Sequence, residues 1–384
     1  MSDIGSNSTS QISVGWCRQA FESSAPLVVK IGSSLLIDAQ GSARRDWMSR
    51  LAAQLARRPG PFILVSSGAI GLGRGAIGLR ARPASLAEAQ AAAAIGQICL
   101  AQLWSDVLGR QGLSCGQMLL TLGDLEDRGR YLNARNTLHT LLGHGIVPVI
   151  NENDTVATGE IRFGDNDRLA ARVAQLAGAE LLVLLSDVDG LHDANPASNP
   201  QAQLIPEVER VTSEIESLAD AASTTDFGTG GMISKLAAAR IATAAGCHVL
   251  LTSGRGKDEP LERYLSTGRG TLFRATDKPL VTRKQWLRGL QHQAGVIHVD
   301  AGAVAALARG ASLLAAGATR VEGSFERGAL VAICGPDGPV GQGLCGYNAA
   351  DARRLVGVKS DRIEQVLGYP GRGAMIHRDD LVLF

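Results

Sequence analysis

Short apolar runs alternate with longer amphipathic stretches from about residue 27 to residue 275. Each short run is bounded by turn-forming residues, which is typical of a strand, and each longer stretch has the apolar spacing of a helix. The predicted strands are Leu27–Ile31, Phe62–Ser66, Gln117–Thr121, Val147–Ile150, Leu181–Leu185 and Val249–Leu251. The predicted helices are Trp47–Arg57, Leu86–Leu108, Leu125–Leu142, Leu169–Leu176 and Ile233–Ala245.

The predicted strands are apolar throughout and do not alternate apolar with polar residues. This pattern predicts a sheet that is buried on both faces. Because helices separate the strands along the chain, we expect an α/β fold with a mostly parallel sheet sandwiched between helices. The stretch Ser85–Ala101 is rich in alanine and carries one charged residue, Glu88, so we expect it to pack inside the fold or against a second subunit.

The sequence changes character after Thr271. Residues 271–294 hold five Lys or Arg against one acid, Asp277, and from Gly295 onward short segments are separated by glycines. We therefore predict an α/β domain at 26–275, a basic linker at 276–294 and a small β-barrel-like domain at 295–384.

The first 25 residues are rich in Ser and Gly and contain one basic residue, Arg18. They lack the apolar core of a signal peptide, so we predict a disordered tail at 1–25. No apolar run approaches the roughly 20 residues that a membrane helix needs, and we expect no membrane partner.

Composition narrows the class of protein further. The 384 residues carry a formal net charge of +1, which favours no polyanionic partner for the chain as a whole. The six cysteines form no C-x-x-C pair and no cluster with zinc spacing. We expect reduced cysteines, a cytoplasmic protein and no metal-ligating residues.

A glycine-rich segment, Gly228-Thr-Gly-Gly-Met-Ile-Ser-Lys235, leads into the predicted helix Ile233–Ala245. Its glycines allow backbone N–H groups to crowd round a phosphate, and a helix N-terminus attracts anions. The segment is not a P-loop, because three residues separate its lysine from the preceding glycine. It nevertheless predicts a phosphate-binding loop.

Polar residues also follow several predicted strands. Lys30-Ile-Gly-Ser-Ser34 ends the first strand and Ser66-Ser-Gly68 the second, and Asn151-Glu-Asn-Asp154 and Gly164-Asp-Asn-Asp167 come later. The carboxyl ends of parallel strands meet at one edge of the sheet, where open α/β sheets bind their ligands. We therefore predict one site at this edge that binds phosphates and carboxylates.

From about Leu27 to the C-terminus, these segments resemble the glutamate 5-kinases of the amino-acid kinase family. The most specific parts are Val147-Pro-Val-Ile-Asn-Glu-Asn-Asp154, the Gly164–Asp167 turn and the glycine–lysine loop. Gln117-Met-Leu-Leu-Thr121 and Leu132-Asn-Ala-Arg135 also look like that family. The region 295–384 resembles the PUA module, an RNA-binding fold that these kinases often carry at the C-terminus.

The resemblance implies ATP-dependent phosphorylation of the γ-carboxylate of L-glutamate to L-glutamyl 5-phosphate, the first step of proline synthesis from glutamate. That carboxylate has a free pKa of about 4.3, so it is ionised at neutral pH and needs no general base. Catalysis then needs cations, Mg²⁺ and N–H donors around the moving phosphoryl group. The seven histidines all lie outside the glycine-rich loop and the polar segments of the predicted site, in agreement with this chemistry.

The resemblance also implies roles for individual residues. Lys30 and Lys235 are expected to reach the phosphates from two sides, and Asp167 is expected to hold both lysines in place. Ser186 and Asp187 are expected to contact the nucleotide. The loop residues expected to bind ATP are Gly228, Thr229, Gly230, Gly231, Met232, Ile233 and Ser234.

Glutamate carries an ammonium group and two carboxylates, and the resemblance assigns three residues to it. Asp154 and Asn166 suit the ammonium end, because an acid and an amide oxygen both accept hydrogen bonds. Ser67, followed by the N–H groups of Gly68 and Ala69, suits a carboxylate.

Other functions fit parts of the sequence. A kinase for another small acid, such as aspartate, would share the loop and the lysines, but the Asn151–Asp154 run and the PUA-like region favour glutamate. An RNA-binding protein working through 295–384 is the alternative of a different class. That region balances nine Lys or Arg with nine Asp or Glu, which disfavours binding by counterion release, so we expect no nucleic-acid partner. The resemblance further implies a homo-oligomer and feedback inhibition by proline.

Overall fold

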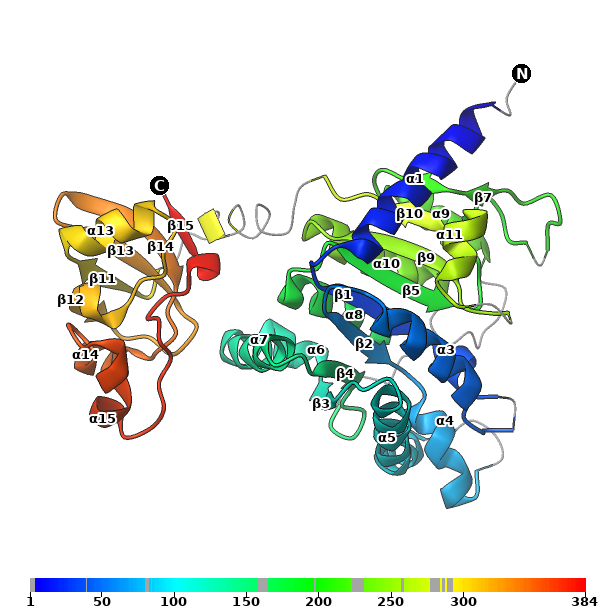
Figure 1. Cartoon of the computed structure of the whole chain (residues 1–384), viewed down its shortest axis with the longest axis horizontal. Helices are drawn as coiled ribbons and strands as arrows, with labels where there is room; N and C mark the ends of the chain where they lie inside the picture. Colours follow the sequence, from blue (N-terminus) through cyan, green and yellow to red (C-terminus); the bar gives the residue numbers. More distant parts are fainter. Residues whose placement is uncertain are drawn as a thin grey trace. The chain divides into compact units, whose positions relative to one another are not determined.

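The computed structural model describes residues 4–38, 40–79, 83, 85–157, 165–196, 198–222, 231–256, 259–276, 284, 287–288 and 293–384. The chain forms two compact units (Figure 1). The first contains Met1–Asp124 and Arg135–Pro279, and the second contains Leu125–Ala134 and Leu280–Phe384. The limits 26–275 and 295–384 stay predictions, and much of the linker 276–294 lies outside the described residues.

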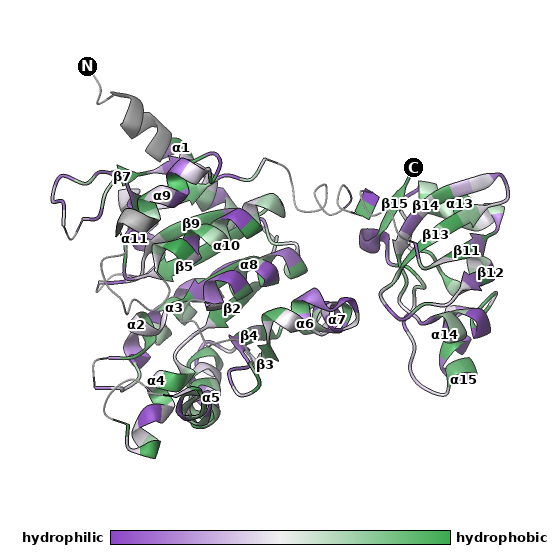
Figure 2. Cartoon of the chain, turned by 180° about the vertical axis from the view of Figure 1, so that it is seen from behind, coloured by the Kyte–Doolittle hydropathy of each residue, from purple (hydrophilic) through white to green (hydrophobic). Residues whose placement is uncertain are grey.

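The first unit is built on an eight-stranded sheet in the order β3-β4-β2-β1-β5-β9-β10-β8. Neighbouring strands are parallel, except that β10 runs antiparallel to β9. The strands are β1 (Leu27–Ile31), β2 (Phe62–Ser66), β3 (Cys115–Leu120), β4 (Val147–Glu152), β5 (Leu181–Ser186), β8 (Glu207–Val208), β9 (His248–Ser253) and β10 (Thr271–Phe273). The predicted mostly parallel sheet is confirmed, and Figure 2 shows β5 and β9 in the hydrophobic colour.

Helices flank this sheet, as the spacing of apolar residues predicted. The helices up to residue 267 are α1 (Ile4–Glu22), α2 (Ser33–Leu36), α3 (Arg45–Ala56), α4 (Ala69–Gly73), α5 (Leu86–Gly109), α6 (Leu122–Glu126), α7 (Arg128–Gly143), α8 (Asp165–Ala177), α9 (Ser213–Ala222), α10 (Met232–Ala244) and α11 (Glu262–Thr267). The end of α6 and the start of α7 belong to the second unit, and the other residues of these helices belong to the first. A short hairpin pairs β6 (Leu191–His192) with β7 (Leu204–Ile205).

Successive residues of a strand point to opposite faces of the sheet, and β1 uses this alternation to separate apolar from polar chemistry. Ile31 packs with Trp47 of α3 in the main core cluster. Lys30 points the other way and contacts Asp167 of α8, which packs against α10. Ile31 and Lys30 therefore serve opposite faces of the sheet, and the face of Lys30 combines the buried charges with buried apolar residues such as Val28.

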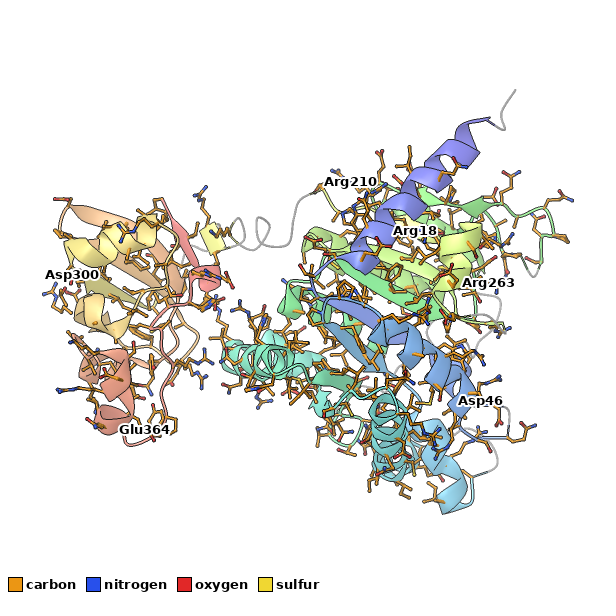
Figure 3. All side chains as sticks on the ribbon, viewed as in Figure 1. Arg18, Asp46, Arg210, Arg263, Asp300 and Glu364 are labelled. Atoms are coloured by element: carbon orange, nitrogen blue, oxygen red, sulfur yellow. The ribbon has the colours of Figure 1, made fainter. Side chains whose placement is uncertain are left out.

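Residues Ile4–Glu22 form helix α1, so the predicted disordered tail at residues 1–25 is wrong over that range. Cys17 and Ala20 of α1 are buried and belong to the core cluster of the first unit. Arg18, labelled in Figure 3, donates a hydrogen bond to the carbonyl oxygen of Leu265 at 3.1 Å. The many Ser and Gly residues of this segment favoured disorder. Composition does not show that a few apolar side chains of the segment pack on residues remote in sequence.

Helix α5 is long and apolar enough, at 24 residues, to cross a membrane by length and composition, although the sequence predicted no run of that kind. In the structure its Leu100, Leu103 and Trp104 are buried in the main core cluster. The indole N–H of Trp104 donates a hydrogen bond to Oγ of Ser66 at 2.9 Å. The helix therefore packs one face on the core of the first unit, whereas Ile98 on another face is 75% exposed.

The second unit has its own five-stranded sheet in the order β12-β11-β13-β14-β15. Its strands are β11 (Gly295–Val299), β12 (Ala318–Gly323), β13 (Leu330–Gly335), β14 (Gly338–Leu344) and β15 (Leu381–Leu383), and its helices include α13 (Ala301–Ala308), α14 (Ala349–Arg354) and α15 (Ile363–Leu367). A separate core cluster that includes Ile297, Ile333 and Leu355 lies within this unit. The β-rich C-terminal unit predicted from the sequence is thus present.

A close approach between α4 and α5 gives a test of this packing. A Cβ atom added at Gly96 would lie 1.8 Å from the carbonyl oxygen of Ala69, whereas one added at Gly109 meets nothing within 4 Å. We expect Gly96→Ala to lower the free energy of unfolding by about 2–3 kcal/mol, as overpacking does. Gly109→Ala, at the end of the same helix, should raise it by roughly 0.5–1 kcal/mol. Urea unfolding followed by circular dichroism measures both, and an unchanged Gly96→Ala protein would contradict the described packing.

Candidate functional site

Asp167 lies between two lysines that are far from it in sequence. Its side chain is fully buried, and its Oδ1 is 2.6 Å from Nζ of Lys30 at the end of β1. Its Oδ2 accepts hydrogen bonds from Nζ of Lys235 at 3.4 Å and from Oγ of Ser234 at 2.8 Å, both in the first turn of α10. The side chains of both lysines are 7% exposed, so all three charges are nearly removed from water.

Burial and charge act against each other at this cluster. Burial by itself raises the pKa of Asp167, but attraction to Lys30 and Lys235 and the hydrogen bonds from Lys30 and Ser234 outweigh it, and the pKa is lowered. Burial lowers the pKa of Lys235, the attraction of Asp167 opposes that change, and the nearby charge of Lys30 adds to it. The carboxylate is therefore held ionised between two cations.

The N-terminus of α10 faces this cluster. Gly231 is its N-cap residue and no side chain caps it. Ile233 is 52% exposed, and Met232 and Ser234 are half-buried. Gly228, Thr229 and Gly230, which the sequence assigned to the same loop, lie outside the described residues, so their part in ATP binding stays a prediction.

Ser186 is the last residue of β5 and Asp187 follows it, at the same edge of the sheet. Ser186 is buried and donates a hydrogen bond to Oδ1 of Asp187 at 3.1 Å. Oδ2 of Asp187 accepts a hydrogen bond from Arg255 at 3.2 Å. Sequence reasoning missed Arg255, although its signal was present: Thr252-Ser-Gly-Arg255 places a polar, glycine-containing turn directly after β9.

The residues assigned to the acceptor substrate lie at the ends of β2 and β4. Ser67 is half-buried directly after β2, and Asp154 is buried just after β4. Oδ1 of Asn166, at the start of α8, accepts a hydrogen bond from the backbone N–H of Glu152 at 3.3 Å. Burial raises the pKa of Asp154 to about 6, so this carboxyl group has lost part of its hydration.

Strand register brings these groups to one edge of the sheet. Ile31 of β1 pairs with Ser66 of β2 and with Leu185 of β5, and Val65 of β2 pairs with Ile150 of β4. The strand ends that carry the assigned residues therefore lie side by side. The structure joins Lys30, Asp167, Ser234 and Lys235 by direct contacts, and it places Ser67, Asp154 and Ser186 at or just after neighbouring strand ends.

The described residues contain no group of three or more His, Cys, Asp or Glu side chains that could hold a metal ion. Both oxygens of Asp167 already face lysines. Mg²⁺ binds through one or two carboxylates together with substrate phosphates and waters. The donor set therefore fits a magnesium ion that arrives on a phosphate ligand, not one held by the protein alone.

Comparison with known families identifies two regions. Residues 25–253 match the amino acid kinase family, and residues 295–367 match the PUA domain. These ranges cover the large sheet up to the end of β9 and most of the second unit.

Curated relatives match along nearly the whole chain. The chain is 55% identical over 361 residues to "Glutamate 5-kinase 1" of Mesorhizobium japonicum, which covers 93% of this chain and 95% of the relative. It is 54% identical to the glutamate 5-kinase of Rhodopseudomonas palustris, over 93% of this chain and 96% of that protein. It is 55% identical to that of Sphingopyxis alaskensis, over 93% and 97% respectively.

The buried carboxyl group of Asp154 predicts a dependence of stability on pH. Its folded-state pKa of about 6 lies above that of the unfolded chain, so the folded state binds more protons and loses stability as pH rises from about 4 to 6. Asp154→Asn should remove a penalty of about 3 kcal/mol at pH 7.5 and very little at pH 4. Urea unfolding without ligands at both pH values measures this, with exposed Asp337→Asn as the control. Equal gains at both pH values would contradict the burial of this acid.

Proposed function

The chain belongs to the amino acid kinase family and, within it, to the glutamate 5-kinases, and from this premise we propose how its residues perform the reaction. The enzyme phosphorylates the γ-carboxylate of L-glutamate with ATP and so gives L-glutamyl 5-phosphate, the first step of proline synthesis from glutamate. The observation that carries this function is the identity of 55% with a glutamate 5-kinase over 93% of the chain, which includes both units.

The attacking group needs positioning more than activation. The γ-carboxylate of glutamate is ionised at neutral pH, since its free pKa is about 4.3, and it attacks the terminal phosphorus of ATP directly. The protein must then hold two anions together and stabilise the charge that spreads over the transferred phosphoryl group. Lys30 and Lys235 supply two positive charges and Asp167 one negative charge, so the cluster presents a net charge of +1.

Asp167 keeps the two lysines in fixed positions before ATP arrives. A cation that is already oriented loses no reorganisation energy when charge develops on the phosphoryl oxygens. Phosphates beside Lys235 favour its charged form and so counteract the effect of burial on its pKa. In this proposal, Lys30 and Lys235 bind the transferred phosphoryl group from β1 and α10, and Asp167 positions both lysines.

The remaining nucleotide contacts come from neighbouring backbone and strand ends. The N-terminus of α10, from Gly231 to Ser234, offers N–H groups and the positive end of the helix dipole to the phosphates. Gly228, Thr229 and Gly230 would extend this loop, as the sequence predicted. Ser186 and Asp187 contact the nucleoside part. ATP enters as its magnesium complex, so Mg²⁺ belongs to the substrate.

Asp154 and Asn166 bind the ammonium group of glutamate, and Ser67 binds one of its carboxylates. The ammonium group offsets the lost hydration of Asp154, whose pKa burial raises to about 6. A homo-oligomer, feedback inhibition by proline and a cytoplasmic location are further parts of the proposal. They rest on the resemblance to the family.

A substrate panel tests the reaction. Purified full-length protein with ATP and Mg²⁺ should release ADP fastest with L-glutamate, slower with L-aspartate and N-acetyl-L-glutamate. Because the product is an acyl phosphate, hydroxylamine should trap it as γ-glutamyl hydroxamate. ADP release with aspartate or acetylglutamate at the glutamate rate or above would overturn the assignment of substrate.

Replacement of Lys235 separates catalysis from substrate binding. We expect Lys235→Met to lower kcat by roughly 10²–10³-fold, because it removes a cation placed to meet charge that grows in the transition state. The KM for glutamate should change far less. Steady-state kinetics measure both, with exposed Lys359→Met in the second unit as the control. A variant that keeps more than half of the wild-type kcat would remove Lys235 from the catalytic site.

A further inference from the structure

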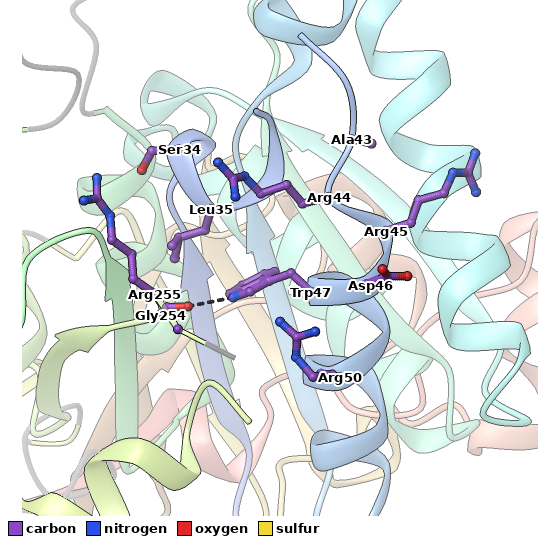
Figure 4. Close-up of a pocket in the computed structure, with 11 residues that line it drawn as sticks. Ser34, Leu35, Ala43, Arg44, Arg45, Asp46, Trp47, Arg50, Gly254 and Arg255 are labelled. Atoms are coloured by element: carbon purple, nitrogen blue, oxygen red, sulfur yellow. Dashed lines mark hydrogen bonds between the residues drawn. The ribbon is translucent and has the colours of Figure 1, made fainter. Parts of the chain in front are cut away.

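A pocket of about 780 Å³ lies beside the N-terminus of α3. Its lining includes Leu35, Arg44, Trp47, Arg50, Gly254 and Arg255, which come from α2, α3 and the turn after β9 (Figure 4). Ligand pockets of small molecules usually measure about 300–1,000 Å³, so this pocket is large enough for a metabolite.

The pocket lies on the face of the sheet opposite the Asp167 cluster. Leu35 and Trp47 belong to the core cluster that contains Ile31, whereas Lys30 points to the other face and contacts Asp167. The pocket is therefore separate from the catalytic cluster assigned above.

The lining is strongly cationic. Among the described residues that line the pocket, four are arginines, namely Arg44, Arg45, Arg50 and Arg255, and one is an acid, Asp46. Figure 4 shows Arg44, Arg50 and Arg255 around the indole of Trp47, whereas Arg45 points away from it. Arg45 instead forms an ion pair with Asp106 at 3.5 Å. Three guanidinium groups therefore share one concave surface.

Arg50 is the clearest sign that this surface receives a ligand. Its Nε is buried and has no hydrogen-bond acceptor within the described part of the chain. A buried donor without an acceptor is costly, and an anion in the pocket would remove that cost. No side chain caps the N-terminus of α3, a helix of 12 residues, which adds favourable potential for an anion.

The floor of the pocket is fixed. Trp47 is 6% exposed, and its indole N–H donates a hydrogen bond to the carbonyl oxygen of Gly254 at 2.7 Å. This bond ties α3 to the turn after β9 and so sets the distance between the arginines of the two elements. Preorganised donors of this kind bind with a smaller entropic cost.

We propose that this pocket binds a small metabolite with two or more phosphoryl groups through Arg44, Arg50 and Arg255. Guanidinium forks match the terminal oxygens of phosphates, and each phosphoryl group offers enough oxygens to accept from more than one arginine. Arg44, Arg50 and Arg255 together with Asp46 leave two positive charges in excess, and a polyanion matches such a surface best. Arg255 also bonds Asp187, so the ligand competes for a side chain that touches the proposed nucleotide contact.

Binding of inorganic pyrophosphate by isothermal titration calorimetry tests this site. The titration uses full-length protein without ATP, Mg²⁺ or glutamate, both as wild type and in a Lys235→Met background that weakens the proposed ATP site. We expect binding in both proteins and an affinity about tenfold or more lower when Arg50→Gln or Arg255→Gln is added. Arg50→Lys, which keeps the charge but not the fork, should lie between.

The matched control is Arg57→Gln, which removes an arginine just beyond the other end of α3, outside the pocket, and should leave the affinity unchanged. Absence of pyrophosphate binding at millimolar concentration, or equal affinity in Arg50→Gln, would overturn the site. Citrate binding as tightly as pyrophosphate would overturn the phosphoryl assignment. Since glutamate phosphorylation is assayed separately, failure of this site and failure of the kinase function are distinguishable.

Discussion

The buried carboxylate of Asp167 is the constraint on which the rest of the site depends. A charged acid without access to water is stable only when cations and hydrogen bonds surround it. Lys30 from β1, with Ser234 and Lys235 from α10, meets that requirement. The acid fixes the end of the first strand against the start of a helix some 200 residues away in sequence. The same contacts that stabilise the fold orient the cations that catalysis needs.

The alternation of side chains along β1 makes this arrangement possible, because it directs Lys30 and Ile31 to opposite faces of the sheet. Lys30 occupies a position of β1 whose neighbours face an apolar core, yet it points to the side of α8 and α10. Asp154 shows the opposite balance, since burial raises its pKa to about 6 and no cation of the described residues counteracts that shift. One carboxylate is satisfied within the protein and the other has lost hydration that a ligand can replace. This difference fits a positioning role for Asp167 and a binding role for Asp154.

The pocket beside α3 shows that the face of the sheet with the Trp47 cluster also has arginines at its edge. Its arginines belong to segments that no motif connects, and Trp47 brings them together through one hydrogen bond to Gly254. Arg255 links this pocket to the proposed nucleotide contact through its ion pair with Asp187. The two faces of the sheet are therefore linked at the carboxyl ends of β5 and β9, although their sites are distinct.

The sequence by itself determined six of the eight strands of the large sheet, the longer helices between them and the family. Continuous apolar runs are a local signal of a sheet buried on both faces, and glycine and lysine at set positions are local signals of phosphate binding. It also named the polar residues after each strand, because parallel strands place such residues at one edge. Only the tertiary structure decided that α1 is ordered, that β10 runs antiparallel and that Arg255 reaches Asp187. Each of these depends on contacts between residues remote in the chain. Burial and pairing of that kind leave no local pattern in composition or spacing.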